Sequence, residues 1–326
     1  MIPALLVIGD ANADVNAELT RFPHEGDDCP LHALGWSSGG SAANVATALA
    51  LLGARARLLA RVGVDPAAAV ALRAAEAAKV DLDLVQRDAA IATGICFAAV
   101  SPGGERTFFS HRGANSALDG GGSPDPLEGA SWVHIAGHAL LEGSQRGITL
   151  ALALEAQRRG IPVSLDLCLP LLRSARQSVL ELLPRLAVVF ANELELPALV
   201  GAPCVGDLID LSLDRFSRDD GPVVAAKLGA RGSRLGGRAR ADLPAFPVTA
   251  RDTTGAGDAY VAGFLFALAR GAEPAIAALL GNALGALTAT RKGAADALPS
   301  RDEVRAFLEL HGASGALPLL AAPPSE

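Results

Sequence analysis

Short runs of apolar residues alternate with helical stretches along most of the chain. Residues 4–8 form the first run, which ends at Gly9 and is typical of a buried strand. Similar runs predict further strands over residues 57–62, 133–136, 162–167, 187–191 and 223–228. Because strands and helices alternate, we expect an α/β fold with a doubly wound, mostly parallel sheet that helices cover on both faces.

Helix boundaries are marked by capping residues, proline and glycine. Ser41 is the expected N-cap of the first helix, and Gly53 is expected to end it. Asp65 followed by Pro66 predicts the start of a second helix, which continues to about Lys79. Near the C-terminus, the apolar period predicts helices over residues 256–270, 274–290 and 301–310.

Two β-rich segments, residues 11–38 and 91–115, interrupt this alternation. The second contains two strand-like runs joined by residues 101–104, Ser-Pro-Gly-Gly, which is a hairpin signal. We expect the two segments to pair into a small separate sheet beside the main one. The expected organisation is one domain over residues 1–312 and a loosely held tail over residues 313–326.

Composition excludes some classes of function. The net charge of −7 and the 4% of aromatic residues argue against nucleic-acid binding, which usually needs a basic face or stacking aromatics. No segment approaches the roughly 20 apolar residues of a membrane-spanning helix, so no membrane partner is expected. Four cysteines lie far apart and predict reduced thiols in a cytoplasmic protein, namely Cys29, Cys96, Cys168 and Cys204.

The segment with the clearest chemistry is residues 252–258, Asp-Thr-Thr-Gly-Ala-Gly-Asp, which precedes an apolar helical run. Glycines at a helix start leave backbone N–H groups exposed, and these groups together with the helix dipole form an anion site. Asp258 would lie beside the anion, where it could take the proton of a hydroxyl that attacks a γ-phosphate. The alternative interpretation is that Asp258 only complements the dipole. The chain lacks a GxxxxGK[ST] segment, which excludes a P-loop enzyme.

A second group of polar residues lies near the N-terminus. Asp10, Asn12 and Asp14 alternate, so an extended chain places their side chains on one face, where they suit the vicinal hydroxyls of a sugar. Asp10 equally fits a turn at the end of the first strand. Gly39 and Gly40 lack a Cβ and would let a substrate approach the backbone closely, although they also fit an ordinary loop before a helix.

Residues 252–258 resemble the C-terminal signature of the ribokinase-like (PfkB-type) carbohydrate kinases, and residues 39–44, Gly-Gly-Ser-Ala-Ala-Asn, resemble the N-terminal signature. Further segments that resemble family motifs follow in the same order, at residues 12–14, 104–106, 192–195, 227–229 and 290–294. The resemblance extends from residue 5 to residue 310. It implies a ribokinase-like fold with a small β-sheet lid and an enzyme that transfers the γ-phosphate of ATP to a sugar hydroxyl.

The resemblance also implies roles for individual residues. The anion turn would consist of Gly255, Ala256 and Gly257, with Asp258 as the base. The implied sugar contacts are Asn12, Asp14, Gly40 and Asn44, and further candidates are Asp10, Gly39 and Arg112. The implied nucleotide contacts are Asn192, Lys227, Gly229, Gly232 and Asn282.

Two cations follow from the same resemblance. Glu195, three residues after Asn192, would hold Mg²⁺ through water, beside ATP as co-substrate. Asp252 and Thr254 match two ligands of a monovalent cation, K⁺, that some members bind. Residues 293–297 lack a hydroxyl that some relatives offer to this cation, so the need for K⁺ stays open.

The acceptor is expected to be a small neutral sugar. Relatives that take a 2-keto-3-deoxy acid carry an Asp-x-Asn-x-Arg segment, whereas this chain has Cys168 and Pro170 in place of the asparagine and arginine. A buried carboxylate without a cation is costly. Arg112 still offers one positive group, so a sugar-acid kinase stays an alternative, as does a nucleoside kinase. A catalytically silent sugar-binding protein is the alternative from another class.

The lid also predicts a partner. A small sheet with free edges and an apolar face is unstable alone, so two lids are expected to pair in a homodimer.

Overall fold

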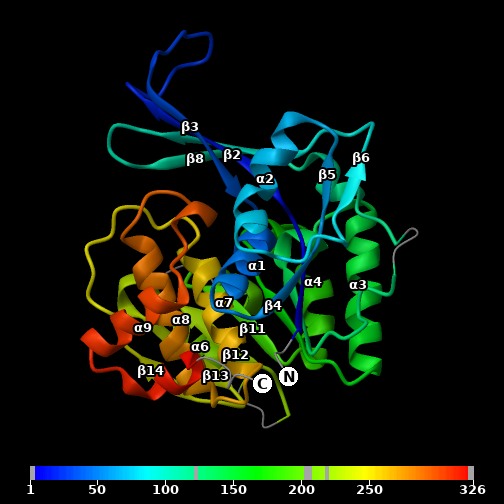
Figure 1. Cartoon of the computed structure of the whole chain (residues 1–326), viewed down its shortest axis with the longest axis vertical. Coiled ribbons are helices and arrows are strands. Elements are labelled where there is room, and N and C mark those ends of the chain that lie inside the picture. Colours follow the sequence, from blue (N-terminus) through cyan, green and yellow to red (C-terminus); the bar gives the residue numbers. More distant parts are fainter. Residues whose placement is uncertain (1–3, 121–123, 202–207, 217–219, 322–326) are drawn as a thin grey trace.

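The computed structural model describes residues 4–120, 124–201, 208–216 and 220–321, and it has a large α/β body with a smaller sheet above it (Figure 1). Within these residues, no helix has the length and apolar character needed to cross a membrane. Cys29, Cys96 and Cys168 are free thiols, and Cys204 lies outside the described residues.

Eight strands form the main sheet, in the order β14-β13-β12-β11-β10-β9-β1-β4. Their bounds are β1 Ala4–Ile8, β4 Arg55–Leu59, β9 Trp132–Ala136, β10 Val163–Asp166, β11 Val188–Asn192, β12 Val223–Lys227, β13 Ser233–Gly237 and β14 Ala241–Leu243. Neighbouring strands from β4 to β12 pair in parallel, whereas β13 and β14 pair antiparallel at one edge. The predicted mostly parallel sheet is therefore confirmed.

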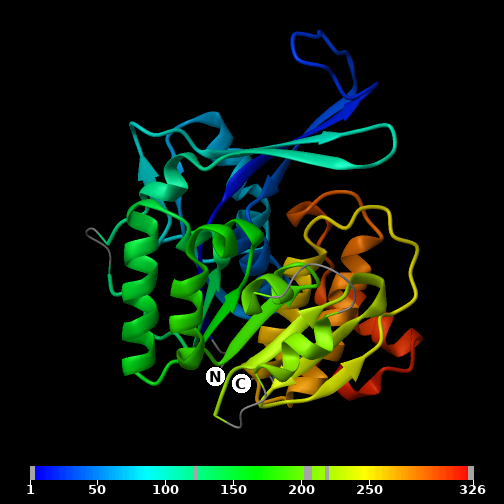
Figure 2. The same cartoon turned by 180° about the vertical axis from the view of Figure 1, so that it is seen from behind.

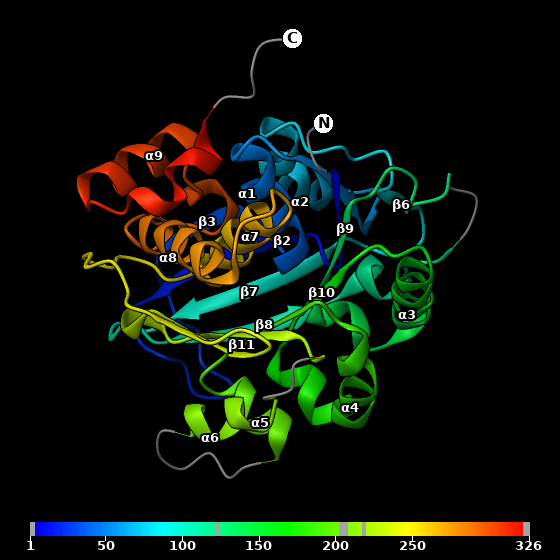
Figure 3. The ribbon, with the colours of Figure 1, turned by 90° about the horizontal axis from the view of Figure 1, so that it is seen from below.

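Helices cover both faces of this sheet (Figure 3). One face carries α1 Ser41–Leu51, α2 Pro66–Ala77, α7 Ala256–Leu268, α8 Pro274–Ala289 and α9 Arg301–Leu310. The other face carries α3 Gly143–Arg158, α4 Leu169–Leu182, α5 Glu195–Val200 and α6 Ile209–Asp214. Side chains alternate between the two cores, because Leu5 and Val7 pack in the first and Leu6 and Ile8 in the second.

The smaller sheet has four strands in the order β3-β2-β7-β8. They are β2 Asn12–Leu19, β3 Leu31–Gly39, β7 Gly94–Val100 and β8 Arg106–His111, and the β7–β8 hairpin extends over the body (Figure 2). We call this sheet the lid. It comes from the two β-rich segments, as the sequence predicted. A separate pair of short parallel strands, β5 Arg61–Gly63 and β6 Gln86–Asp88, lies beside it.

Several boundaries differ from the sequence-based expectation. The N-cap of α1 is Gly40 rather than Ser41, and Ser41 instead starts the helix with its hydroxyl free for another contact. The strand expected over residues 57–62 is two strands, β4 and β5.

The tail is more ordered than predicted. Residues Ser314–Leu320 form a 3₁₀ helix in which Ala316 and Leu320 are fully buried against the body. The guanidinium of Arg301 fixes this turn by donating to the Leu320 carbonyl at 3.0 Å. The apolar residues that suggested a loose tail are therefore part of the core, while residues 322–326 lie outside the described chain.

Candidate active site

The anion turn lies at the start of α7. Gly255 is the N-cap and has φ 77°, a left-handed conformation that glycine adopts without strain. A Cβ on Gly257 would lie 3.7 Å from the ammonium nitrogen of Lys227. The N–H of Ala256 donates to the Thr253 carbonyl at 3.2 Å. The start of α7 therefore lies beside a positive charge, which is an arrangement suited to a bound phosphate.

Asp258 follows in the first turn of α7 and is held from α1. The Ser41 hydroxyl donates to Asp258 Oδ1 and the Asn44 amide donates to Oδ2, each at 2.7 Å. Burial raises the pKa of Asp258, and these two hydrogen bonds and the charge of Lys227 partly oppose that effect. The carboxylate is thus fixed in place and more basic than a surface aspartate, as a general base requires.

Asp14 faces the same region from β2. Burial, followed by the charge of Asp258, raises the pKa of Asp14 to about 7. Its Oδ1 is buried without a hydrogen-bond partner. A Cβ on Gly39 would lie 2.1–2.3 Å from the atoms of this carboxylate, and a Cβ on Gly40 would lie 2.4 Å from the Asp10 carbonyl. The glycine pair therefore leaves room for Asp14 and for the backbone at residue 10.

Arg112 and Asp10 form an ion pair that is part of the same candidate site. Nη2 of Arg112 lies 2.8 Å from Asp10 Oδ1 and 2.5 Å from the side-chain oxygen of Gln145. The side-chain nitrogen of Gln145 donates to Asp10 Oδ1 at 3.1 Å. Nε and Nη1 of Arg112 are buried without a hydrogen-bond partner. Asn12 accepts a hydrogen bond from Asn115 at 2.8 Å. The predicted polar residues after β1 are therefore brought together.

Lys227 joins two carboxylates on the opposite side of the anion turn. Its Nζ lies 2.6 Å from Asp166 Oδ1 at the end of β10, and Glu195 is near enough to interact electrostatically. Burial alone would lower the pKa of Lys227, but the charges of Asp166 and Glu195 raise it above its usual value. Burial raises the pKa of both carboxyl groups. The lysine therefore stays charged beside the turn.

Asn192 and Glu195 also have a structural role. The Asn192 side chain accepts from the backbone N–H of Glu195 at 2.8 Å, and Glu195 Oε2 accepts from the N–H of Asn192 at 2.8 Å. This reciprocal pair closes the turn of residues 192–195 that leads into α5, whose N-cap is Leu194. The side-chain oxygen of Asn192 and one carboxylate oxygen of Glu195 therefore accept hydrogen bonds within this turn.

The remaining predicted nucleotide positions lie along one loop region. The amide of Asn282 in α8 donates to the carbonyls of Leu243 and Pro244, each at 3.2 Å, so it ties α8 to the segment after β14. Gly232 has φ 92°, and a Cβ there would lie 2.1 Å from the Leu243 carbonyl. Gly229 has φ 57° with open space around it.

Asp252 and Thr254 lie together just before the anion turn. The backbone N–H of Thr254 donates to Asp252 Oδ1 at 2.8 Å. The lid contacts the same carboxylate, because Nη1 of Arg106 lies 2.7 Å from Asp252 Oδ1.

Sequence reasoning assigned no site role to Ser41, Gln145, Asp166 and Arg106. Asp166 carried a usable signal, because it ends a strand of a parallel sheet, where such folds open their crevice. Gln145 carried none, since it lies within the first turn of a helix whose position relative to β1 no sequence pattern reveals.

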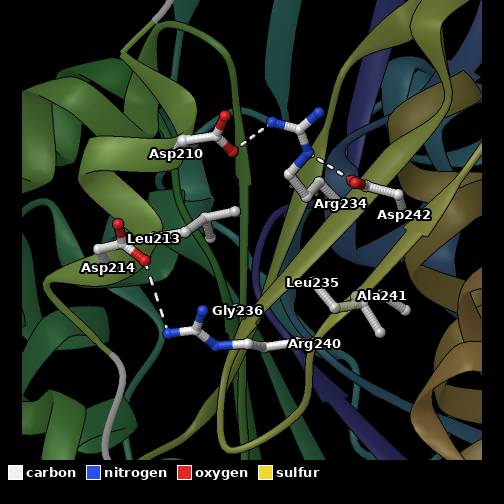
Figure 4. Close-up of a pocket in the computed structure, with 9 residues that line it drawn as sticks. All are labelled: Asp210, Leu213, Asp214, Arg234, Leu235, Gly236, Arg240, Ala241 and Asp242. Carbon is white, nitrogen blue, oxygen red and sulfur yellow. Dashed lines mark hydrogen bonds and ion pairs between the residues drawn. The ribbon is translucent and has the colours of Figure 1, made fainter.

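A separate surface hollow of about 300 Å³ lies between α6, β13 and β14 (Figure 4). Its charged side chains pair with one another: Arg234 contacts Asp210 and Asp242, and Arg240 lies 3.5 Å from Asp214. It shares no residue with the site described above.

Comparison with known proteins gives a consistent result. Residues 3–301 match the pfkB family of carbohydrate kinases. The ATP-dependent ribose-1-phosphate kinase of Halopiger xanaduensis is 34% identical over 306 residues, which cover 93% of this chain and 97% of that protein.

Two solved structures are similar over most of the chain. The structure of Arabidopsis thaliana ribokinase with ribose and ATP matches with a TM-score of 0.82 and 27% identity, covering 95% of this chain and 99% of that one. A double mutant of Vibrio cholerae fructokinase, solved with fructose, ADP and a potassium ion, matches with a TM-score of 0.74 and 26% identity, covering 94% and 98%.

Proposed function

Because the chain belongs to the pfkB family of carbohydrate kinases and is an ATP-dependent sugar kinase, we propose that it phosphorylates a hydroxyl of a small neutral sugar with Asp258 as the general base. The observation that carries this proposal is the position of Asp258. Its carboxylate is partly buried, held by Ser41 and Asn44, and placed in the first turn after the anion site.

The proposed mechanism uses this geometry directly. Asp258 accepts the proton of the sugar hydroxyl as that oxygen attacks the γ-phosphorus and the bond to the ADP oxygen breaks. The positive end of the α7 dipole, with the N–H groups of Gly255 and Gly257, stabilises the charge on the transferred phosphoryl group. Asn12, Asp14 and Asn44 orient the sugar, and Asn192, Gly229, Gly232 and Asn282 border the nucleotide.

Mg²⁺ is proposed as the ion that accompanies ATP. Among the described residues, no group of three or more His, Cys, Asp or Glu side chains forms a metal site. That fits Mg²⁺, which usually binds one or two carboxylates together with phosphates and water. Asp166 and Glu195 would hold the ion, and their raised pKa values are those of buried carboxylates that a further cation would favour in the charged form. When bound, Mg²⁺ would neutralise phosphate charge.

The charges of the pocket support a neutral acceptor. Arg112 is the cation at the sugar end, and it is already paired with Asp10. A phosphate or carboxylate on the sugar would therefore also face the carboxylates of Asp14 and Asp258. A second candidate is a phosphorylated sugar, because Nε and Nη1 of Arg112 lack hydrogen-bond partners and one relative is a ribose-1-phosphate kinase. The nearest carboxylate oxygen to Nη1 in an ion pair, from Glu142, is 3.9 Å away.

A phosphoryl-transfer comparison with Mg-ATP tests the acceptor. We expect kcat/KM for ribose or fructose to exceed that for ribose 1-phosphate, adenosine and a 2-keto-3-deoxy acid by about tenfold or more, the scale on which an unsuited polar group is rejected. ADP release without an acceptor serves as the blank. A clear preference for ribose 1-phosphate would replace the neutral sugar by the second candidate, and a preference for adenosine would indicate a nucleoside kinase.

The outer face of the lid supports a homodimer. Trp36, Val15, Phe97 and Phe109 lie opposite one another across the four strands, so they share one face. Asp14 is one position removed from Val15 and therefore points to the other face, toward Asp258. The outer face is thus apolar at its centre, and Trp36 and Phe109 are about half exposed. An apolar face of this kind is suited to a second copy of the chain.

Two adjacent phenylalanines provide a matched test of the dimer. Phe109 lies on the outer face and is 56% exposed, whereas Phe108 is 57% exposed and lies on the inner face. We expect a dimer for the wild type, monomers for Phe109→Glu and a retained dimer for Phe108→Glu in multi-angle light scattering. A monomeric wild type at micromolar concentration would contradict the proposal.

The three free thiols and the use of ATP support a cytoplasmic location.

A further inference from the structure

We propose that the guanidinium of Arg106 is a built-in cation at Asp252, which ties the lid to the anion turn and makes a bound monovalent cation unnecessary. Arg106 is a positioning residue in this proposal, because it acts through Asp252 and the loop that precedes α7. The inference rests on the proposed kinase activity for one of its readouts only.

The first observation is that both oxygens of the Asp252 carboxylate already have donors against them. Oδ1 accepts from the backbone N–H of Thr254 at 2.8 Å and lies 2.7 Å from Nη1 of Arg106. Oδ2 accepts from the backbone N–H of Gly293 at 3.1 Å, and the Thr254 hydroxyl is a further donor. A carboxylate has about four acceptor positions, so these donors leave none for a metal ion.

The second observation concerns charge. Asp252 is the carboxylate that the family resemblance assigns to a monovalent cation, and the related fructokinase was solved with potassium. Here the side chain of Asp252 is 9% exposed and already has a guanidinium against it. A potassium ion at Asp252 would be repelled by that guanidinium. The residues of this chain therefore do not fit a monovalent cation at this position.

The third observation is that Arg106 connects the strands of the lid to the loop before the anion turn. Arg106 is the first residue of β8 and pairs with Val100 of β7. β7 runs beside β2, which carries Asn12 and Asp14. On the body side, Asp252 joins the loop before the anion turn to the loop at Gly293. The ion pair therefore links the strand that faces the sugar to the turn that would hold the phosphate.

A second ion pair between lid and body provides a control. Lys292 lies 3.2 Å from Glu18 of β2, but both side chains are largely exposed, and such pairs contribute little. The Arg106 pair is better shielded from water, because its side chains are 25% and 9% exposed, and its carboxylate lies just before the anion turn.

The test compares salts of potassium, sodium and tetramethylammonium at equal ionic strength, so that screening is constant. We expect the wild type to show the same Tm and the same kcat/KM for its sugar in all three salts. Arg106→Met removes the charge and keeps an unbranched apolar side chain. Its kcat/KM in tetramethylammonium is expected to fall by about tenfold, the usual size of coupling between two sites, and potassium is expected to restore most of it.

Thermal unfolding with ADP gives a readout that needs no sugar turnover. Potassium is expected to raise the Tm of Arg106→Met and to leave the Tm of the wild type and of Lys292→Met unchanged. Arg106→Lys, which keeps a positive charge, should behave as the wild type.

Three results would overturn the inference: a potassium requirement in the wild type, an Arg106→Met variant that matches the wild type in every salt, or a loss that potassium does not restore. If Arg106→Met fails to fold, the salt series on the wild type and on Arg106→Lys still decides the question. If no sugar is phosphorylated, the proposed function fails, and the unfolding measurements still test Arg106.

Discussion

Asp258→Asn is expected to lower kcat by about 10² or more, which is the usual cost of removing a general base. Asparagine keeps the size of the side chain, and it can still accept a hydrogen bond from Ser41 or Asn44, both now 2.7 Å away. It cannot take the proton of the attacking hydroxyl. Binding of ATP should persist, because the anion turn uses backbone N–H groups. Initial rates and calorimetric titration with a nonhydrolysable ATP analogue measure the two quantities.

Asp214→Asn is a matched control for this variant. It makes the same chemical change at an exposed residue of α6, whose carboxylate lies 3.5 Å from Arg240. Turnover near the wild-type rate in purified, folded Asp258→Asn would remove Asp258 from the mechanism. A similar loss in Asp214→Asn would show that the effect is not specific to the site.

Lys227→Met is expected to lower the free energy of unfolding by about 3–5 kcal/mol, the cost of breaking a buried ion pair by removing one partner. The change leaves the Asp166 carboxylate buried without the ammonium that lies 2.6 Å from it, and Glu195 loses the same neighbour. Burial already raises the pKa of Asp166 above its unfolded value, so ionisation of Asp166 destabilises the folded state as pH rises. Without Lys227 this destabilisation is larger, and the difference in unfolding free energy between variant and wild type should therefore grow with pH. Urea unfolding at acidic and alkaline pH measures it.

A double variant separates the charge from the size of the side chain. Replacing both members of a buried pair by apolar residues is often neutral, so Lys227→Met combined with Asp166→Leu should regain much of the lost stability while staying inactive. Lys292→Met, a lysine change at an exposed pair, should cost under about 1 kcal/mol. An unchanged urea midpoint for Lys227→Met would contradict this account of the pair.

Local signals in the sequence predicted the elements that depend on local chemistry. The helix over residues 301–310 begins and ends as expected, because Ser300 and Glu303 form a capping box there. Asp65 caps α2 by accepting from the N–H of Ala68 at 3.1 Å, as the Asp-Pro pair predicted. The position of Asp258 in the first turn of α7 was predictable for the same reason, since the glycines and the helix start are adjacent to it in the chain, and its role as base stays a prediction.

Contacts between distant segments could not be predicted in this way. Ser41 has the residue type of an N-cap, yet its hydroxyl is used by Asp258 because α1 packs against α7. The ion pair of Lys227 with Asp166 depends on strand order, and the contact of Arg106 with Asp252 depends on how the lid lies on the body. These three contacts decide charge and position in the site, and each requires the tertiary fold.

The hydrogen bond from Ser41 to Asp258 joins residues 217 positions apart, which has a consequence for the chain as it is synthesised. The strand that carries Asn12 and Asp14, β2, leaves the ribosome long before α7 does. Until then the chain lacks both the proposed proton acceptor and the anion turn, so we expect an incomplete chain to transfer no phosphate. We therefore expect activity to appear only after α7 has docked against α1. A chain truncated before residue 256 is expected to be inactive even where its remaining strands fold.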